Sequence, residues 1–488
     1  MISLNALLHH IHLPLVPSDT QITGITLDSR KIQQGYLFAA LPGAKSNGCD
    51  YIDVAIEKGA SAILLPTNAS FPETNQCIAI HCDNPRYVLA LMTAIFFPNH
   101  PQHQVAITGT NGKTSTADFI RQIWQLQNLK AATIGTLGVI SNTNYNYTGP
   151  VLTTPDSIML HEILTNLVEH NVQHLALEAS SHGLDQYRLD GLTIEAAGFT
   201  NLTRDHLDYH HDFQHYLEAK LRLFKNILPI GGVAGVNADM DPDALIKIKQ
   251  AILDRKQNLR LVGEQGQFLQ LLSVTPLPEG QKLEIKTALN DVFSVTIPLL
   301  GRYQVDNILL AVALIAKNEQ DIANLIPLLP HLKGVRGRME QAAILPNGAA
   351  IYVDYAHTPD ALAHLLQSLR PHTDNDLYVI FGAGGDRDAG KRPLMAQEAS
   401  KYADCVIITD DNPRTEDPDH IRKEVKAGAP AALEIADREE AIAQTIKKLQ
   451  SGDILVVAGK GHEQGQIIGS VVHPFDDVTI IRKHVSSL

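Results

Sequence analysis

A short glycine-rich segment constrains the fold of this 488-residue chain more than any other feature. It reads Gly109-Thr110-Asn111-Gly112-Lys113-Thr114 and lies between the apolar run 105–107 and a helical pattern. A strand, a tight loop and a helix N-terminus in this order form a cradle in which backbone N–H groups and the helix dipole face an anion. Lys113 adds a positive charge, and the Thr114 hydroxyl suits a Mg²⁺ ion. The segment predicts a nucleoside triphosphate site in an α/β fold.

The segment departs from the general phosphate-loop pattern at one position. That pattern, G-x-x-x-x-G-K-[ST], has glycine where this chain carries Ile107. The alternative interpretation is an ordinary glycine turn before a helix. Gly-Lys-Thr at the helix start favours the phosphate site over that alternative.

Composition narrows the class of protein and its partners. The chain is 44% hydrophobic and 19% charged, as in ordinary globular proteins, and its formal net charge is −13. This charge argues against a nucleic-acid partner and against an anionic membrane surface. Four cysteines without metal-ligand spacing favour free thiols in a reducing compartment. No apolar run is long enough to cross a bilayer, and the N-terminus is a poor signal peptide, so we expect a cytoplasmic protein without membrane insertion. We also expect a monomer.

Two clusters of helix breakers divide the chain, at 97–101 and at 332–337. We therefore expect domains at 1–99, 100–334 and 335–488. Apolar strands alternate with helical patterns in the second and third, which predicts mostly parallel sheets covered on both faces. Residues 256–300 instead predict an antiparallel excursion. The predicted fold class is α/β, with a small N-terminal α/β domain, a central phosphate-loop domain and a Rossmann-like C-terminal domain.

Polar residues gather where the predicted strands end. Open α/β sheets bind ligands beyond the carboxyl ends of their strands, so two sheets with polar rims predict a cleft between domains. The polar segments are 178–182, 201–206, 354–357, 382–387, 410–414 and 459–463.

Glu178 and His206 are candidate ligands of a Mg²⁺ ion that bridges nucleotide phosphates. Glu178 directly follows the apolar run 175–177, where a charge must be paired or bind a cation. For His206 the alternative is a surface histidine beside two aspartates, and spacing alone does not decide between the two.

Lys220 falls on the apolar stripe of a predicted helix over 213–224, together with Phe213, Leu217, Leu221 and Phe224. Sequence alone favours a lysine that extends to solvent. The alternative is a desolvated lysine with a lowered pKa, which can form a carbamate with CO₂. A carbamate would turn this cation into an anion able to help hold Mg²⁺.

Charged residues of the C-terminal segment predict a pocket for an amino acid. Arg387 and Arg414 follow different strands, and two guanidinium groups suit a ligand with carboxylates. Glu463 could pair with an ammonium group. Near the second boundary, Arg336 and Arg338 could reach phosphates; the alternative for this pair is solvated charge. Asp354, after a predicted strand, could accept from a ribose or position a cation.

Several of these segments together resemble the Mur ligases, the ATP-dependent amide-forming enzymes of peptidoglycan precursor synthesis. The resemblance covers essentially the whole chain, and it is carried by 109–114, 178–182, 200–210 and 337–340. Within the family, Asp411-Asn412-Pro413-Arg414 resembles the motif of members that add meso-2,6-diaminopimelate to UDP-N-acetylmuramoyl-L-alanyl-D-glutamate. Lysine-adding members lack that arginine.

The resemblance implies a role for each matching residue. ATP would contact Gly109, Thr110, Asn111, Gly112, Lys113, Thr114, Ser115, Asn307, Arg338 and Asp354. The UDP-linked substrate would contact Leu27, Ser29, Ala44, Lys45, Ser46, Thr153, Thr154, Ser180, Gln186 and Arg188. Diaminopimelate would contact Arg387, Asp411, Asn412, Pro413, Arg414, Gly459 and Glu463. Lys220 matches the family's carbamylated lysine, so Mg²⁺ would be held by Thr114, Glu178, His206 and carbamylated Lys220. The catalytic residues would be Lys113, Glu178, His206 and Lys220.

The implied reaction is an ATP-driven amide ligation through an acyl phosphate, with closure of the last domain excluding water. Two positions depart from the family pattern: Leu152 stands where some relatives carry Asn, and Gln304 occupies a position that is often Asn. The alternatives are a lysine-adding Mur ligase, a ligase like folylpolyglutamate synthase, and a non-catalytic nucleotide-binding regulator. A regulator would not require strand-end arginines in a separate domain.

Overall fold

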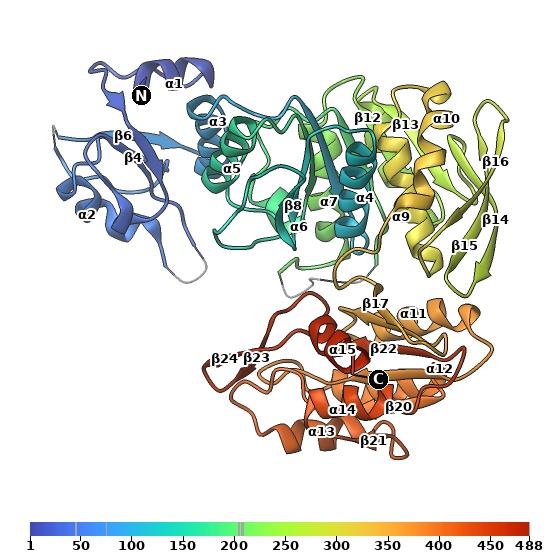
Figure 1. Ribbon diagram of the computed structural model, residues 1–488. Helices are drawn as coiled ribbons and strands as arrows, with labels where there is room; N and C mark the ends of the chain where they lie inside the picture. The colour runs from blue at the N-terminus through green and yellow to red at the C-terminus, as the bar shows by residue number, and fades with distance from the viewer. Residues whose placement is uncertain (44–45, 75, 204, 206–208, 488) are drawn as a thin grey trace. The chain divides into compact units, whose positions relative to one another are not determined.

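A computed structural model describes residues 1–43, 46–74, 76–203, 205 and 209–487. They divide into two compact units, whose elements are drawn in Figure 1. Unit 1 comprises Met1–Gly266 with Leu310–Ile315, and unit 2 comprises Gln267–Leu309 with Ala316–Leu488. Among the described residues, no helix is long and apolar enough to cross a membrane. The division into three domains at 99/100 and 334/335 stays a prediction.

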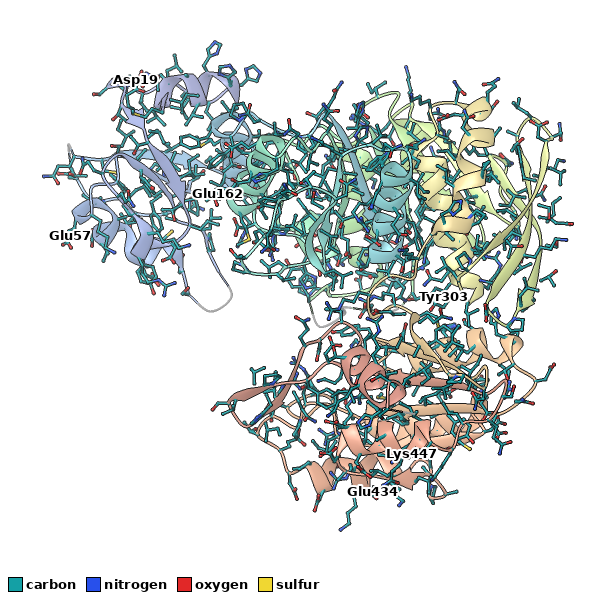
Figure 2. The ribbon with its side chains drawn as sticks, in the orientation of Figure 1. Asp19, Glu57, Glu162, Tyr303, Glu434 and Lys447 are labelled. Atoms are coloured by element: carbon teal, nitrogen blue, oxygen red, sulfur yellow. The ribbon has the colours of Figure 1, made fainter. Side chains whose placement is uncertain are left out.

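A four-stranded parallel sheet forms the N-terminal part of unit 1. Leu37 joins an apolar cluster with helices α1 (Leu4–His10) and α3 (Pro85–Phe96), while its neighbour Phe38 joins a cluster on the other face with α2 (Ile52–Glu57). Burial on both faces explains why these strands are almost continuously apolar. Charged side chains such as Glu57 are exposed (Figure 2). The strands in spatial order are β3 (Gly24–Thr26), β4 (Tyr36–Ala39), β5 (Ala62–Pro66) and β6 (Ile78–Cys82).

A mostly parallel sheet forms the rest of unit 1, as the alternation of apolar and helical segments predicts. Its spatial order is β13-β12-β11-β7-β10-β8-β9, and β9 runs antiparallel to β8. The strands are β7 (His103–Thr108), β8 (Ala131–Gly135), β9 (Gly138–Ser141), β10 (His174–Glu178), β11 (Ala196–Phe199), β12 (Val233–Asn237) and β13 (Asn258–Gly263).

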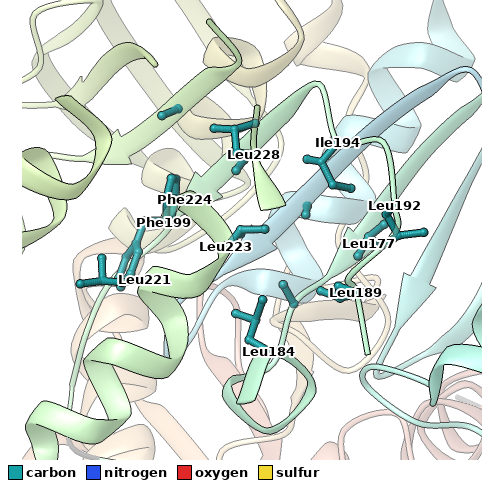
Figure 3. Packing of buried hydrophobic residues seen from close by; sticks show 14 of the residues in the cluster. Leu177, Leu184, Leu189, Leu192, Ile194, Phe199, Leu221, Leu223, Phe224 and Leu228 are labelled. Atoms are coloured by element: carbon teal, nitrogen blue, oxygen red, sulfur yellow. The ribbon is translucent and has the colours of Figure 1, made fainter. Parts of the chain in front are cut away.

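Helices cover both faces of this sheet. Helix α4 (Lys113–Leu126) packs on β7, β8 and β10. On the other face, strand residues Leu177 and Phe199 pack with Leu184, Leu221 and Phe224 from the covering segments (Figure 3). These segments are α5 (Ser157–Glu169), α6 (Ser181–Asp185), α7 (Phe213–Arg222), a π turn (Leu223–Ile227) and α8 (Pro242–Asp254). The cluster fixes the ends of β10 and β11, where predicted site residues begin.

Unit 2 begins with an antiparallel meander, which confirms the excursion predicted for 256–300 from Leu269 on; β13, inside that range, is instead parallel to β12. Strands β14 and β15 pair from Leu269 to Thr287, and β15 pairs with β16. Helix α9 (Arg302–Ile315) follows. The strands are β14 (Leu269–Leu277), β15 (Gly280–Thr287) and β16 (Val292–Ile297).

A second α/β sheet completes unit 2, with the order β17-β18-β22-β19-β20-β21. The chain runs from β18 to β19, β20 and β21 and then returns to β22, between β18 and β19. Such a reversal opens a ligand crevice at the carboxyl ends of the strands. The strands are β17 (Glu340–Ile344), β18 (Ala350–Asp354), β19 (Leu377–Phe381), β20 (Cys405–Ile408), β21 (Leu433–Glu434) and β22 (Ile454–Ala458).

Helices on the two faces of this sheet enclose separate apolar clusters. One face carries α11 (Pro359–Leu369), α12 (Lys391–Tyr402) and α13 (Pro418–Lys426), and the other carries α14 (Arg438–Ile446) and α15 (Asp477–Val485). A hairpin of β23 (Gly465–Ile468) and β24 (Val471–Pro474) follows the β22 end loop. The α/β class is confirmed in both units.

Candidate active site

The glycine loop after β7 has a backbone that only glycine adopts easily at two points. Gly109 has φ +136° and Gly112 has φ +82°. A Cβ on Gly109 would collide with the Thr200 hydroxyl and crowd the Asn201 backbone, both beyond the end of β11. Asn201 also accepts from the Asn111 N–H through Oδ1 at 2.9 Å. The loop is therefore held against the neighbouring strand, as a phosphate cradle requires.

Helix α4 starts directly at the loop. Its N-cap is Gly112, and no side-chain hydrogen bond caps the helix there. A helix N-terminus of this kind suits an anion. Lys113 Nζ donates to the carbonyl oxygens of Gly109 at 3.0 Å and Thr110 at 2.6 Å. Thr114 and Ser115 occupy the first turn, as predicted for ATP contacts.

Lys220 is buried behind the loop, with 1% of its surface exposed. Its Nζ donates to the Gly109 carbonyl at 2.7 Å and lies 4.5 Å from the centre of the Tyr216 ring. Burial lowers the pKa of Lys220 well below its ordinary value; the positive charge of Lys113 lowers it further, and Asp205 opposes both. The solvent-extended interpretation is wrong, whereas carbamylation stays a prediction.

The helix that carries Lys220 differs in part from the sequence prediction. It ends at Arg222 and continues as a π turn, where we expected a helix to Phe224. Phe213 is 40% exposed, since it begins the helix at the surface, while Leu217 and Leu221 are buried as expected.

Glu178, at the end of β10, is 2% exposed. Its carboxylate accepts from the Thr136 N–H at 2.8 Å and the Thr136 hydroxyl at 3.2 Å, and that hydroxyl lies 3.1 Å from Thr153 Oγ1. Glu178 and Thr114 line one cavity of about 10 Å³, close to the smallest that can hold a single water molecule. A carboxylate and a hydroxyl facing one small cavity fit Mg²⁺, which takes a few protein oxygens and completes its shell with water and phosphates.

The other two predicted ligands, His206 and carbamylated Lys220, stay predictions. Among the described residues, no group of three or more His, Cys, Asp and Glu side chains is arranged to hold a metal ion. His206 lies outside those residues, so its role stays a prediction.

The residues predicted for the middle of the UDP-linked substrate are joined by hydrogen bonds. Thr154 Oγ1 donates to the Glu178 carbonyl at 2.8 Å and accepts from the Ser180 N–H at 3.0 Å. Arg188 donates to the Thr154 carbonyl at 2.6 Å and to Gln186 Oε1 at 2.8 Å. This network connects the predicted substrate residues with the metal candidate Glu178.

The predicted uridine contacts occupy two loops of the N-terminal sheet. Leu27 and Ser29 flank Asp28, whose carboxylate accepts from the Arg30 N–H at 3.0 Å; the Arg30 guanidinium lowers the pKa of Asp28 to about 2. In the second loop, the Ser46 carbonyl accepts from the Gly43 N–H at 3.1 Å. Ala44 and Lys45 lie outside the described residues.

In unit 2, the predicted nucleotide residues lie together. Asp354 accepts from two backbone N–H groups at 2.7 and 2.8 Å; burial raises its pKa and Arg338 opposes that shift. The Arg338 guanidinium lies 4.6 Å from the centre of the Tyr355 ring. Gln304 Nε2 approaches the Arg338 carbonyl at 3.4 Å, and Asn307 Nδ2 approaches Gln304 Oε1 at 3.4 Å.

The predicted acceptor residues surround the crevice at the ends of β19, β20 and β22. A Cβ on Gly384 would lie 2.8 Å from Arg414 Nη1 and 3.8 Å from Arg387 Cγ, so both arginines flank this glycine. A Cβ on Gly459 would lie 2.8 Å from Asp411 Oδ2. Arg414 Nη1 also donates to the Gly385 carbonyl at 2.8 Å. Two cationic side chains beside one glycine suit a ligand with carboxylates.

A hydrogen-bonded group forms the opposite part of this pocket. Asn412 Nδ2 donates to Glu463 Oε2 at 3.0 Å. The neighbouring Pro413 places its carbonyl where a Cβ on Gly385 would collide with it. The structure therefore brings the predicted acceptor residues of unit 2 together at the ends of β19, β20 and β22, and this group is called the acceptor pocket below.

Comparison with known proteins covers nearly the whole chain. Residues 21–104 match the Mur ligase family, catalytic domain; residues 107–315 match the Mur ligase middle domain; and residues 337–461 match the Mur ligase, glutamate ligase domain. The chain belongs to the Mur ligase family. It is accordingly an ATP-dependent ligase.

Full-length relatives narrow its place in the Mur ligases. A protein of Caulobacter vibrioides named UDP-N-acetylmuramoyl-L-alanyl-D-glutamate–2,6-diaminopimelate ligase is 48% identical over 94% of this chain and 95% of its own length. A protein of the same name from Zymomonas mobilis is 46% identical over 96% and 95%. A solved structure of a ligase with this name superposes with TM-score 0.71 and 34% identity over 98% of both chains. MurF from Acinetobacter baumannii, at 18% identity and TM-score 0.62, shares the fold.

Motif reasoning missed several residues that lie beside the predicted site residues. Tyr209 accepts from Gln186 at 3.1 Å and donates to Asp185 at 2.8 Å, although it belongs to the family-like segment 200–210. Arg86 donates to the Pro42 carbonyl at 2.5 Å beside the uridine loop, and no local pattern marks it. Lys460 is fully buried in the acceptor pocket, and of its segment 459–463 only Gly459 and Glu463 were predicted as contacts.

Proposed function

We propose that this Mur ligase joins meso-2,6-diaminopimelate to the D-glutamyl residue of UDP-N-acetylmuramoyl-L-alanyl-D-glutamate, with conversion of ATP to ADP and phosphate. The observation that carries the proposal is the acceptor pocket, where Arg387 and Arg414 flank Gly384 and Glu463 is held by Asn412. The names of the full-length relatives support diaminopimelate over the lysine and folylpolyglutamate alternatives.

The reaction begins with an approach of two anions. The γ-carboxylate of the D-glutamyl residue attacks the γ-phosphorus of ATP, ADP leaves, and an acyl phosphate forms. Lys113 and the first N–H groups of α4 neutralise the phosphates, so that the carboxylate can approach in line. Bound Mg²⁺ would supply further neutralisation, with Thr114 and Glu178 as its ligands and His206 and carbamylated Lys220 as the other candidates.

Lys220 is proposed to carry a carbamate. Carbamate formation requires the neutral amine, and burial favours that form of Lys220. The ammonium first loses one proton; CO₂ then adds to the neutral Nζ and a second proton leaves, so that a buried cation becomes an anion beside the loop. That charge would offset the positive charge of Lys113.

The second step consumes the acyl phosphate. The free amine of diaminopimelate attacks the acyl carbon, phosphate leaves, and the nitrogen loses a proton. Arg387 and Arg414 would bind the carboxylate at the far end of the acceptor, while Glu463 would pair with an ammonium group. Lysine lacks the far carboxylate and would leave a guanidinium unpaired, at a cost on the order of a few kcal/mol.

We also propose that the protein acts in the cytoplasm. All four cysteines are free thiols, which suits a reducing compartment. The monomeric state and the closure of the last domain stay predictions.

Phosphate release tests the proposed function. Purified protein is supplied with ATP, Mg²⁺ and the UDP-muramoyl dipeptide, and meso-diaminopimelate, L-lysine and D-amino acids are offered in parallel. We expect rapid release with diaminopimelate alone. Equal rates with lysine, or release that no amino acid stimulates, would refute the assignment.

A further inference from the structure

Lys460 is a fully buried lysine of the acceptor pocket to which the proposed reaction gives no part. It follows β22 between Gly459 and Gly461, which have φ +110° and +54°. A Cβ on Gly461 would lie 2.7 Å from Tyr355 Cβ, so a side chain there would push the loop away. The two glycines therefore let the chain turn tightly and carry Lys460 inward.

The contacts of Lys460 fix the orientation of Asn412. Lys460 Nζ donates to Asn412 Oδ1 at 3.0 Å, and the Ile467 N–H donates to the same atom at 2.9 Å. An ammonium and a backbone N–H are donors only, so the atom between them must be the amide oxygen. The Asn412 nitrogen is thereby forced to the other side.

The other side of that amide is Glu463. Asn412 Nδ2 donates to Glu463 Oε2 at 3.0 Å, and Lys460 Nζ lies 3.5 Å from the same oxygen. Both contacts engage Oε2, and among the described residues Glu463 Oε1 accepts no hydrogen bond. One oxygen of the carboxylate is thus anchored and the other stays available to a ligand.

We propose that Lys460 is a positioning residue that sets recognition of the acceptor's ammonium group, because it locks Asn412 and Glu463 in the orientation that binds it. This inference rests on the proposed function. It predicts an acceptor-specific role: loss of Lys460 frees the Asn412 amide to rotate and leaves Glu463 unanchored, while the nucleotide residues keep their own contacts. The buried ion pair of Arg438 and Asp477 carries no such inference, because its two fully buried side chains are bonded to each other.

Kinetics of Lys460→Met provide the first test. We expect the KM for meso-diaminopimelate to rise about tenfold, the effect of removing one charge-assisted hydrogen bond. The KM values for ATP and the UDP-linked substrate should stay within twofold. Lys460→Gln can still donate to Asn412 Oδ1, and its KM for diaminopimelate should rise by about threefold. Lys447→Met, at an exposed lysine (Figure 2), is the matched control and should change nothing.

A double-mutant cycle separates positioning from general damage. If Lys460 acts through Asn412, adding Lys460→Met to Asn412→Ala should raise the KM for diaminopimelate less than twofold further. Should the methionine variant fail to fold, the same cycle is run with Lys460→Gln. Additive effects, an unchanged KM, or equal rises for all three substrates would overturn the inference. Wild-type protein that does not use diaminopimelate at all would instead overturn the proposed function.

Discussion

Lys113 and Lys220 donate to the same carbonyl oxygen, that of Gly109, at 3.0 and 2.7 Å. Two ammonium groups on one carbonyl repel each other, and Lys220 is also removed from water. Arg392 is equally buried, but it forms ion pairs with Glu416 and Glu424. Among the described residues, Lys220 contacts an aromatic ring and a carbonyl, and the charge of Asp205 only partly opposes its loss of a proton, whereas Arg392 has two carboxylates. This contrast at the residue scale is the physical reason to expect a modification that reverses its charge.

Replacement of Lys220 tests that expectation. We predict that Lys220→Ala lowers kcat about 100-fold or more, because the loss of a preorganised charge in an active site has effects of this size. A short carboxylic acid such as acetate should restore part of the activity by supplying the missing anion, measured as kcat against acetate concentration. Lys447→Ala serves as the control. Full activity of Lys220→Ala without added acid would exclude the carbamate.

We predict that Arg414 determines the choice between diaminopimelate and lysine as the acceptor. Its backbone has φ +52°, and its N–H donates to the Ile467 carbonyl at 3.0 Å, so the side chain starts from a fixed position. We expect Arg414→Ala to reduce the preference for diaminopimelate over lysine about tenfold to 100-fold, with the KM for ATP within twofold. Competition between the two acceptors in one assay measures the ratio. An unchanged ratio would assign the far carboxylate to another residue.

A buried histidine makes stability depend on pH. His161 is fully buried, its Nδ1 lies 2.8 Å from His100 Nε2, and burial lowers the pKa of His161 to about 3. The unfolded chain therefore binds more protons than the folded chain between about pH 6.5 and pH 3, and stability falls as pH falls through that window.

We predict a loss of about 1.4 kcal/mol from this one residue between pH 7.5 and pH 5.5. Urea unfolding at both pH values measures it, and His161→Leu should shrink the difference. His9→Leu, at an exposed histidine, should leave the difference as in the wild type. If both variants match the wild type, His161 does not carry the effect.

At the scale of elements, the sequence predicted what depends on local pattern. The glycine loop, the antiparallel excursion and the polar ends of β10, β18 and β22 are all confirmed as structure, because glycine spacing and apolar alternation are local signals. The contacts of Lys460 and of Tyr209 were not predictable. Each depends on a partner about 20 to 50 residues away, as Lys460 does on Asn412, and one sequence does not show which loops meet.

Substitution of Gly109 tests whether ATP binding depends on the backbone shape of the phosphate loop. Gly109→Ala places a Cβ against Thr200 and Asn201, in a backbone region that alanine rarely adopts. We expect a stability loss of about 1–3 kcal/mol and a KM for ATP raised at least tenfold. Gly231→Ala is the matched control, since it has φ +77° but no atom within 4 Å of its Cβ. Equal ATP defects in both variants would mean that backbone strain alone, and not the collision, disturbs the site.

At the scale of the whole molecule, the proposed reaction divides its two steps between different residue groups. Unit 1 holds the glycine loop, Lys220 and Glu178, which are proposed to serve phosphate transfer to the substrate carboxylate. Unit 2 holds the predicted nucleotide contacts Arg338 and Asp354, and also Arg414 and Glu463, which are proposed to serve capture of the amine. A lesion in unit 2 that touches the acceptor alone should therefore leave the first step intact.

Trapping of the acyl phosphate tests this division. Enzyme, ATP, Mg²⁺ and the UDP-linked substrate are mixed with hydroxylamine and without any amino acid, so that each acyl phosphate formed is captured as a hydroxamate. We expect Arg414→Ala to form hydroxamate within twofold of the wild-type rate, although its ligation of diaminopimelate is impaired. Lys220→Ala should form about 100-fold less, since its defect precedes the acceptor. If Arg414→Ala loses hydroxamate formation as fully as Lys220→Ala does, the acceptor pocket also takes part in phosphate transfer and the two steps cannot be assigned to separate residue groups.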